Sequence, residues 1–209
     1  MKILIADDHA VVREGLKQVL SESPDFIVAA EASTGQEVMD KISKKDFDLV
    51  VLDIAMPGRG GLDVLKEIKT QKPKLSVLVL SMYPEEQYAV RVLKAGASGY
   101  LTKESAPDEL VKAIRQISQG KKYVSPSLAE KLALDLEISS DRPPHEILSD
   151  REYQVMCMIA SGKTLKEISE ELSLSIKTIS TYRTRILEKM NMKNNAELTH
   201  YAIKNRLID

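Results

Sequence analysis

One pattern repeats five times in the first 119 residues: a short apolar run is followed by an amphipathic segment. The apolar runs are rich in Val, Ile and Leu without polar alternation, which is typical of strands buried on both faces. They occupy residues 3–6, 27–31, 49–52, 77–80 and 99–101. Five strands that alternate with helices predict an α/β domain in which helices cover both faces of a parallel sheet.

The segments between these runs have the spacing of helices. In the first of them Val12, Leu16 and Val19 recur every three or four residues, so they lie on one helix face. Capping residues Ser33 and Thr34 precede the second segment. We expect helices at 11–20, from about 33 onward, at 61–70, at 85–94 and at 107–119.

Residues 120–147 break this rhythm and predict a linker. Gly120 ends the last helix, and Ser125 with the Pro and Ser that follow it favours a cap for a short helix at 128–136. The Ser, Asp and Pro residues at 139–144 are typical of a mobile connection.

From residue 148 onward the strand pattern is absent. Helical periodicity predicts four helices, at about 150–160, 165–172, 176–190 and 195–205. We therefore expect three parts: a first domain at 1–119, a linker with a short helix at 120–147, and an all-α domain at 148–209.

Composition constrains the setting of the protein. No apolar run approaches the roughly 20 residues that span a membrane, so we expect no membrane association. The single cysteine, Cys157, cannot form an internal disulfide, which favours a reducing, cytoplasmic compartment. The net charge is −1, but residues 175–209 carry seven basic and three acidic side chains. This local excess suggests a patch that faces an anionic partner.

Acidic side chains follow two of the predicted strands. Asp7 and Asp8 come directly after the first strand, and Asp53 follows the third. In a flavodoxin-like, doubly wound sheet of order 2-1-3-4-5, these strands are neighbours at the point where ligands bind. Three close carboxylates repel one another unless a cation compensates them, and Mg²⁺ prefers oxygen ligands. The sequence therefore predicts a magnesium site suited to phosphoryl transfer, in which a carboxylate can be the nucleophile.

Two further polar residues belong to the same sheet edge. Ser81 ends the fourth strand and Lys103 follows the fifth, so both are expected near Asp53. A hydroxyl and an ammonium group suit the oxygens of a phosphoryl group. Each residue alone is more often structural, but their joint position at four strand ends favours a site.

These residues carry a resemblance, since residues 1–119 are similar to a response-regulator receiver domain. The matching stretches are ILIADDHAVVREGL, DLVVLDIAMPGRGGLDVL, VLVLSMY and KAGASGYLTKES. The resemblance implies that Asp53 accepts a phosphoryl group from a sensor histidine kinase. It implies that Mg²⁺ binds the carboxylates of Asp7, Asp8 and Asp53 and the backbone carbonyl of Ala55.

The same resemblance assigns the switch residues. Ser81 and Lys103 would hold the phosphoryl group, and the rotamer of Tyr100 would follow the phosphorylation state. Many receivers have proline after the lysine, where this chain has Glu104. That difference leaves a cis peptide at this position in doubt, but not the role of the lysine.

Two of the C-terminal helices are joined by a tight turn. Leu165, Ile168 and Leu172 form an apolar stripe, and Ser175 is a candidate N-cap for the next helix. This predicts a helix-turn-helix whose second helix enters the major groove of DNA. A projection at about 100° per residue turns Ile179, Tyr182, Ile186 and Met190 inward. The opposite face is polar and basic.

Residues 148–206 resemble the LuxR/NarL-type four-helix DNA-binding domain. The stretch LSDREYQVMCMIASGKTLKEISEELSLSIKTISTYRTRILEKMNMKNNAEL carries this similarity. It implies that Ser180, Thr181 and Thr184 read bases in double-stranded DNA, and the last helix is where relatives dimerise. The predicted phosphate contacts are Lys177, Thr178, Arg183 and Arg185. Several relatives carry basic side chains at positions 180 and 184, so base preference cannot be transferred from them.

The order of the two resemblances is that of the NarL/FixJ family of response regulators. It implies a transcription factor rather than an enzyme, in which phosphorylation controls formation of a DNA-binding homodimer. Three alternatives stay open: a constitutive DNA-binding protein with an inactive receiver, a phosphatase-type enzyme that uses the carboxylate cluster, and a regulator whose C-terminal domain binds protein.

Overall fold

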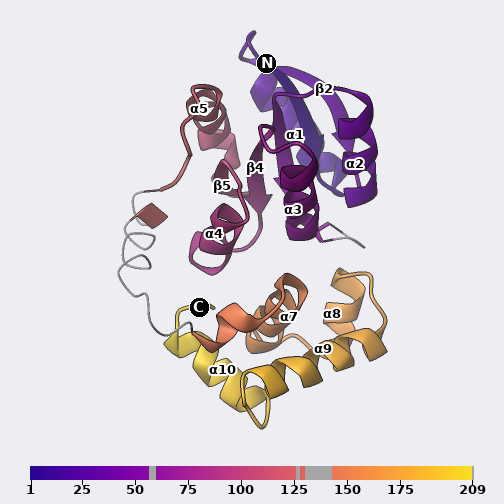
Figure 1. Ribbon diagram of the computed structural model, residues 1–209, viewed down its shortest axis with the longest axis vertical. Helices are drawn as coiled ribbons and strands as arrows, with labels where there is room; N and C mark the ends of the chain where they lie inside the picture. Colours follow the sequence, from indigo (N-terminus) through magenta and orange to yellow (C-terminus); the bar gives the residue numbers. More distant parts are fainter. Residues whose placement is uncertain (57–59, 126–127, 130–142, 209) are drawn as a thin grey trace. The chain divides into compact units, whose positions relative to one another are not determined.

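Five parallel strands form the sheet of the N-terminal half in the order β2-β1-β3-β4-β5, which confirms the flavodoxin-like prediction (Figure 1). The strands are β1 (Lys2–Ala6), β2 (Ile27–Ala32), β3 (Leu49–Asp53), β4 (Ser76–Ser81) and β5 (Gly99–Thr102). Because β1 pairs with both β2 and β3, the strand order reverses beside it. The carboxyl ends of β1 and β3 consequently lie side by side.

The computed structural model describes residues 1–56, 60–125, 128–129 and 143–208. It divides into two compact units, Met1–Ala129 and Glu130–Asp209. Most of the short helix predicted at 128–136, and about half of the predicted linker, lie outside the described residues.

Helices cover both faces of the sheet. They are α1 (Ala10–Ser21), α2 (Gly35–Lys44), α3 (Gly61–Gln71), α4 (Glu85–Lys94) and α5 (Ala106–Ser118). Side chains of α1 and α5, such as Leu16 and Leu110, share one buried cluster with Ile3, Ile5 and Val51. The alternate strand residues Leu4, Val50, Leu52 and Val79 point to the other face and are equally buried. Their alternation explains why the strands read as continuous apolar runs.

Tyr123 extends the N-terminal unit beyond α5. Its backbone N–H donates to the carbonyl of Ser98 at 2.8 Å, and its hydroxyl donates to Glu109 at 2.8 Å. Tyr123 is buried, and a Cβ added at Gly99 would lie 2.9 Å from the Cβ of Tyr123. The sequence pattern assigns this residue to the linker, yet it packs in the core of the first unit.

Helices make up the described part of the second unit, as predicted. After a short 3-10 turn, η1 (Pro144–Ile147), come α7 (Asp150–Ala160), α8 (Leu165–Glu171), α9 (Ile176–Lys189) and α10 (Asn195–Lys204). Helix α7 packs against α8, α9 and α10, and α8 packs against α9. Within the described residues, no helix combines the length and the apolar character needed to cross a membrane.

Candidate functional site

Three carboxylates converge where β1 and β3 end. Asp7 and Asp8 follow β1, and Asp53 is the last residue of β3, whose register pairs Ala6 with Leu52. One ligand atom from each of these carboxylates and from His9 lies within 4.8 Å of the others. Asp7 and Asp53 are buried, with 2% and 1% of their surface exposed. Such acids must be compensated by positive charge or hydrogen bonds.

Lys103 supplies part of that compensation. Its ammonium nitrogen lies 2.6 Å from Asp7 Oδ2 and 2.7 Å from Asp53 Oδ2. The backbone N–H of Lys103 donates to the carbonyl of Ser81 at 2.7 Å, which ties the end of β5 to the end of β4. Three carboxylates and one ammonium leave two negative charges, which is the charge that a divalent cation balances.

The donor set fits a hard cation. Carboxylate oxygens are preferred ligands of Mg²⁺, and Asp8 Oδ1 is buried without a hydrogen-bond partner. The ring nitrogen Nδ1 of His9 lies 3.0 Å from this oxygen, in an orientation that makes no hydrogen bond, and 3.2 Å from Asp7 Oδ1. The described residues thus form an acidic pocket typical of Mg²⁺ binding.

Asp53 is held at the floor of the pocket. The N–H of Ala55 donates to its Oδ1 at 2.9 Å, while Lys103 occupies Oδ2. Burial raises the pKa of the Asp53 carboxyl, although Lys103 and the Ala55 N–H act in the opposite direction. A more basic carboxylate is a better nucleophile once it is ionised. The carbonyl of Ala55 as a metal ligand stays a prediction.

Ser81 and Tyr100 lie behind the pocket. Both are buried, and the Ser81 hydroxyl accepts a hydrogen bond from the N–H of Tyr83 at 3.0 Å. The Tyr100 ring is turned inward, and its hydroxyl donates to the Tyr83 carbonyl at 2.7 Å. Burial raises the pKa of Tyr100, so the phenol stays protonated. The loop after β4 is therefore linked to β5 through one phenolic hydrogen bond.

Two residues that the sequence reasoning missed shape this pocket. The Arg13 guanidinium on α1 donates from Nη1 to the carbonyl of Asp7 at 2.7 Å, and its Nε donates to Glu31 at 3.0 Å. Gly61 begins α3 so close to β3 that an added Cβ would lie 2.3 Å from the carbonyl oxygen of Asp53. Both act on backbone atoms, for which no side-chain pattern in the sequence gives a signal.

The two helices of the predicted helix-turn-helix begin at side-chain caps. Thr164 accepts the N–H of Glu167, whose carboxylate accepts the N–H of Thr164 in return. Ser175 accepts the N–H of Thr178 at 3.0 Å and starts α9. Between the helices Ser173 has a φ of 52°, a left-handed conformation that reverses the chain.

Most of the predicted DNA contacts lie on the outer face of α9. Five of the seven are exposed: Lys177, Ser180, Thr181, Thr184 and Arg185. Thr178 and Arg183 are half-buried, since Thr178 belongs to the helix cap and Arg183 Nε donates to Asn195 Oδ1 at 2.7 Å. Tyr182, predicted to point inward, is half-buried, whereas Ile179 and Ile186 are fully buried.

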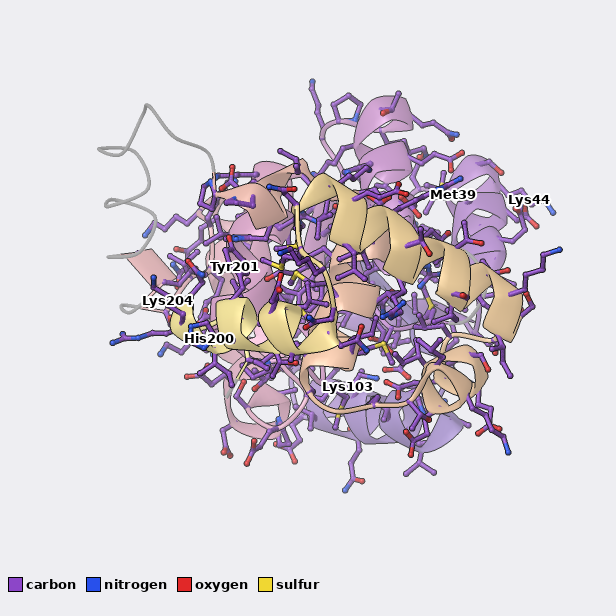
Figure 2. All side chains as sticks on the ribbon, turned by 90° about the horizontal axis from the view of Figure 1, so that it is seen from below. Met39, Lys44, Lys103, His200, Tyr201 and Lys204 are labelled. Carbon is purple, nitrogen blue, oxygen red and sulfur yellow. The ribbon has the colours of Figure 1, made fainter. Side chains whose placement is uncertain are left out.

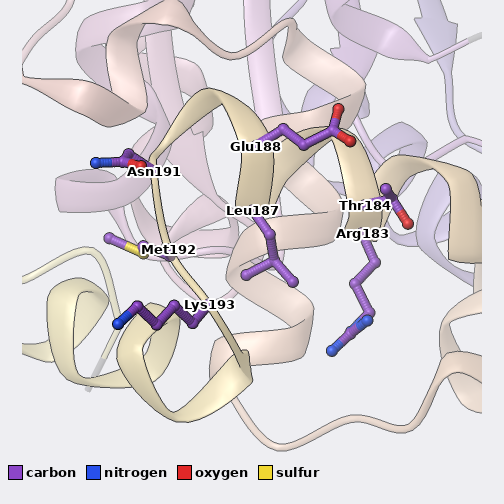
Figure 3. A pocket seen from close by; sticks show the side chains of 7 residues that line it. All are labelled: Arg183, Thr184, Leu187, Glu188, Asn191, Met192 and Lys193. Atoms are coloured by element: carbon purple, nitrogen blue, oxygen red, sulfur yellow. The ribbon is translucent and has the colours of Figure 1, made fainter.

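The end of α9 borders a shallow hollow of about 370 Å³. Figure 3 shows Arg183, Thr184, Leu187 and Glu188 from α9 on one side of it. The turn to α10 supplies the remaining wall residues Asn191, Met192 and Lys193. The hollow combines basic and acidic groups on an open surface. It therefore extends the polar face of α9 rather than forming an enclosed binding site.

Helix α10 presents polar and apolar residues to solvent. His200, Tyr201 and Lys204 are labelled along this helix in Figure 2. Ile203 is 54% exposed. On another side of the helix, the Tyr201 hydroxyl lies 2.8 Å from Nδ1 of His145 in η1.

Comparisons with known proteins match both units. Residues 3–115 match the family described as response regulator receiver domain, and residues 146–202 match the family described as bacterial regulatory proteins, luxR family. The chain is 39% identical over 217 residues to the oxygen regulatory protein NreC of Staphylococcus epidermidis, with all of both chains covered.

Solved structures of RcsB resemble the chain along nearly its whole length. RcsB from Salmonella enterica serovar Typhimurium, bound to promoter rprA in the presence of phosphomimetic BeF3⁻, is 29% identical with a TM-score of 0.65. That match covers 96% of this chain and 98% of RcsB. A structure of two RcsB dimers bound to two parallel DNAs is 29% identical, with a TM-score of 0.60 and 100% and 99% coverage.

The fold of the first unit, the helix-turn-helix of the second and both family matches lead to the same assignment. The chain belongs to the NarL/FixJ family of response regulators, in which a receiver domain precedes a LuxR-type DNA-binding domain.

Proposed function

We propose that Asp53 accepts a phosphoryl group from a phosphohistidine of a partner histidine kinase, and that this modification controls DNA binding by α9. The observation that carries the proposal is the buried Asp53 carboxylate, because Lys103 contacts both Asp53 and Asp7. Asp8 Oδ1, in the same cluster, is buried without a hydrogen-bond partner. The pocket contains a buried carboxylate, an ammonium group and two further acidic side chains, which supports the proposed nucleophile and cation site.

The side chains divide the work of phosphoryl transfer. An ionised oxygen of Asp53 attacks phosphorus as the bond to the histidine nitrogen breaks, so the phosphoryl group moves from nitrogen to oxygen. Mg²⁺ held by Asp7, Asp8, Asp53 and the Ala55 carbonyl would neutralise the charge on the phosphoryl oxygens. Lys103 and the Ser81 hydroxyl bind those oxygens after the transfer.

The acyl phosphate carries roughly two negative charges at neutral pH, where the ionised Asp53 carboxylate carried one, so the pocket becomes more negative by about one charge. Lys103 then exchanges its contacts with Asp7 and Asp53 for phosphoryl oxygens, and Ser81 moves with it. Because Ser81 accepts the Tyr83 N–H and Tyr100 donates to the Tyr83 carbonyl, this movement reaches the loop after β4 and β5. The surface beside these strands changes and favours a homodimer that binds DNA.

The output is sequence-specific binding of double-stranded DNA. Ser180, Thr181 and Thr184 meet base edges, while Lys177, Thr178, Arg183 and Arg185 are contacts to phosphates. Exposure of the central part of this face supports the assignment. The RcsB structures described as bound to DNA support it by similarity.

The decisive experiment treats the full chain with acetyl phosphate and Mg²⁺ and detects the acyl phosphate by intact mass. The unmodified chain is expected to gain one phosphoryl group, and Asp53→Asn is expected to gain none. Asp46→Asn is the matched control, because Asp46 carries an exposed carboxylate that pairs with Lys72 in the same domain. Phosphorylation of Asp53→Asn at the level of the control would remove Asp53 from this role.

A further inference from the structure

Two threonines on the outer face of α9 have already used their hydroxyl hydrogens. Thr181 donates to the carbonyl of Lys177 at 2.9 Å, and Thr184 donates to the carbonyl of Ser180 at 3.2 Å. A carbonyl oxygen can only accept, so in each pair the threonine is the donor. Toward solvent, each side chain therefore presents a methyl group and the free lone pairs of its oxygen.

An aliphatic side chain extends this surface toward the start of α9. Ile176 is the first residue of the helix, lies one turn before Ser180 and is 51% exposed. The N-terminal residues of a recognition helix contact base edges in the major groove. The exposed side chain of Ile176 therefore lies where bases are read. The base-reading part of α9 thus combines methyl groups with acceptor oxygens.

Besides the threonines, this part of the helix carries the donor groups of Lys177, Ser180, Arg183 and Arg185. Arg183 directs Nε to Asn195 and is half-buried, so its guanidinium is drawn toward α10. Arg185 follows Thr184 on the outer side, and Lys177 lies in the first turn. These cations suit phosphates, as proposed above, and leave Ser180 and the two threonines to meet the bases.

We propose that Thr181 and Thr184 make the DNA-binding domain select A·T base pairs at the centre of each half-site, reading the thymine methyl and the adenine amino group. In the major groove thymine offers a methyl group and adenine offers the N6 amino donor, which match a threonine methyl and a threonine oxygen that accepts. This inference rests on the proposed DNA binding by α9 and adds the base pairs that are bound.

The same chemistry disfavours guanine at these positions. Guanine presents two acceptors, N7 and O6, to the major groove, and they find no hydrogen in a threonine that donates to its own helix. A threonine that rotated to donate to guanine would release the carbonyl of Lys177 or Ser180. When guanine N7 and O6 face a threonine oxygen, these acceptors lose the hydrogen bonds that they made with water. Guanine is therefore disfavoured because the threonines have no free hydrogen to donate to it.

The test begins with selection of bound duplexes from a randomised pool by the full chain, phosphorylated with acetyl phosphate and Mg²⁺. Each central thymine of the selected half-site is then replaced by uracil, which removes only the methyl group. Loss of one buried methyl contact is expected to weaken binding roughly fourfold. Selected half-sites are expected to carry A·T pairs at the centre.

Three variants assign the effect to the side chain. Thr181→Ser keeps the hydroxyl and removes the methyl. At one position of the half-site, replacement of thymine by uracil is then expected to weaken binding no further; this loss of affinity on replacement is called the uracil penalty. Thr181→Val keeps a methyl and removes the oxygen, so the uracil penalty is expected to remain while the preference for adenine over guanine falls. Thr70→Ser is the control, since Thr70 also donates to the carbonyl four residues before it, on α3 of the receiver domain.

The outcomes separate the inference from the function on which it rests. Half-sites with guanine or cytosine at the centre, or an unchanged affinity on replacement of every central thymine by uracil, overturn the inference while DNA binding stands. Absence of binding to any duplex at low salt, with the receiver phosphorylated, overturns the proposed DNA binding itself. A uracil penalty that Thr181→Ser or the equivalent Thr184→Ser removes, and Thr70→Ser does not, supports the inference.

Discussion

Gly61 determines how closely the start of α3 approaches β3, the strand that ends in Asp53. An added Cβ would lie 2.3 Å from the carbonyl oxygen of Asp53 and 2.4 Å from Cα of Ile54. Both atoms belong to the backbone, so the clash can be relieved only if the end of β3 or the start of α3 moves. The position of the Asp53 carboxylate therefore depends on a neighbour without a side chain.

We predict that Gly61→Ala lowers the free energy of unfolding of the receiver domain by about 1–3 kcal/mol, the usual cost of overpacking. The rate of phosphorylation by acetyl phosphate should fall as well, because the displaced carboxylate no longer meets Lys103.

Gly15→Ala is the control: nothing lies within 4 Å of its added Cβ in α1. There the substitution should raise stability by roughly 0.5–1 kcal/mol. Urea unfolding of both variants measures these changes, and equal stabilities would contradict the prediction.

The sequence predicts which side chains meet in the pocket but not what holds them. Asp7, Asp53 and Lys103 could be brought together because parallel strands end at one sheet edge. The contact of Arg13 with the Asp7 carbonyl could not be predicted, because its acceptor is a backbone atom and the pattern of side chains does not indicate it. Tyr123 was assigned to the linker for a similar reason, since its partners are Ser98 and Glu109 on other elements.

At the scale of elements, α7 and α9 are joined by a buried acid. Glu152 completes the capping box of α7 with Ser149 and also accepts the Lys189 ammonium at 2.6 Å. Burial tends to raise the pKa of Glu152, but hydrogen bonds from Lys189 and Ser149 outweigh it, so the pKa lies below its ordinary value. A carboxyl whose folded-state pKa is lowered stabilises the fold above its unfolded pKa.

We predict that protection of α7 and α9 amides against hydrogen exchange falls as the pH is lowered from about 5 through the folded pKa of Glu152. In Lys189→Met the stability at neutral pH should fall by about 1 kcal/mol, because the lysine is partly exposed and its pairing is screened. The decline toward acid pH should then be weaker, since the pKa is no longer held down by the ammonium.

The matched control is Lys166→Met, which removes a lysine from an exposed pair with Glu170 at 4.0 Å. This variant should keep the protection of the unmodified chain throughout the pH range, after correction for intrinsic exchange rates. An identical response of the two variants would show that the contact of Lys189 with Glu152 does not stabilise the second unit.

Helix boundaries in the second unit were predictable wherever a side chain caps the helix. Ser149, Thr164 and Ser175 each accept a backbone N–H at the start of a helix, and such residues mark helix starts in any sequence. The tight turn between α8 and α9 was predicted, but its backbone conformation was not. It depends on the left-handed φ of Ser173, a conformation for which glycine or asparagine is the usual signal.

At the scale of the whole molecule, regulation requires that a change in the receiver alter DNA affinity. The Tyr100 hydroxyl joins β5 to the loop after β4, through the Tyr83 carbonyl. Ser81 binds the N–H of the same Tyr83. Ser81 at the end of β4 and Tyr100 on β5 thus bind the same peptide segment at Tyr83.

We predict that Tyr100→Phe leaves phosphorylation of Asp53 intact but lowers the ratio of DNA affinities with and without phosphorylation. We expect DNA binding to depend on this bond more in the phosphorylated state than in the unphosphorylated one. Because one neutral hydrogen bond contributes about 1 kcal/mol, its loss should lower the ratio by at most roughly fivefold. The control is Tyr123→Phe, which removes a hydroxyl from another buried tyrosine of the same domain, bonded to Glu109. Fluorescence anisotropy of labelled duplex measures each affinity, and intact mass measures the fraction phosphorylated. An unchanged ratio in Tyr100→Phe at full phosphorylation would mean that the signal leaves the pocket by a route other than Tyr83.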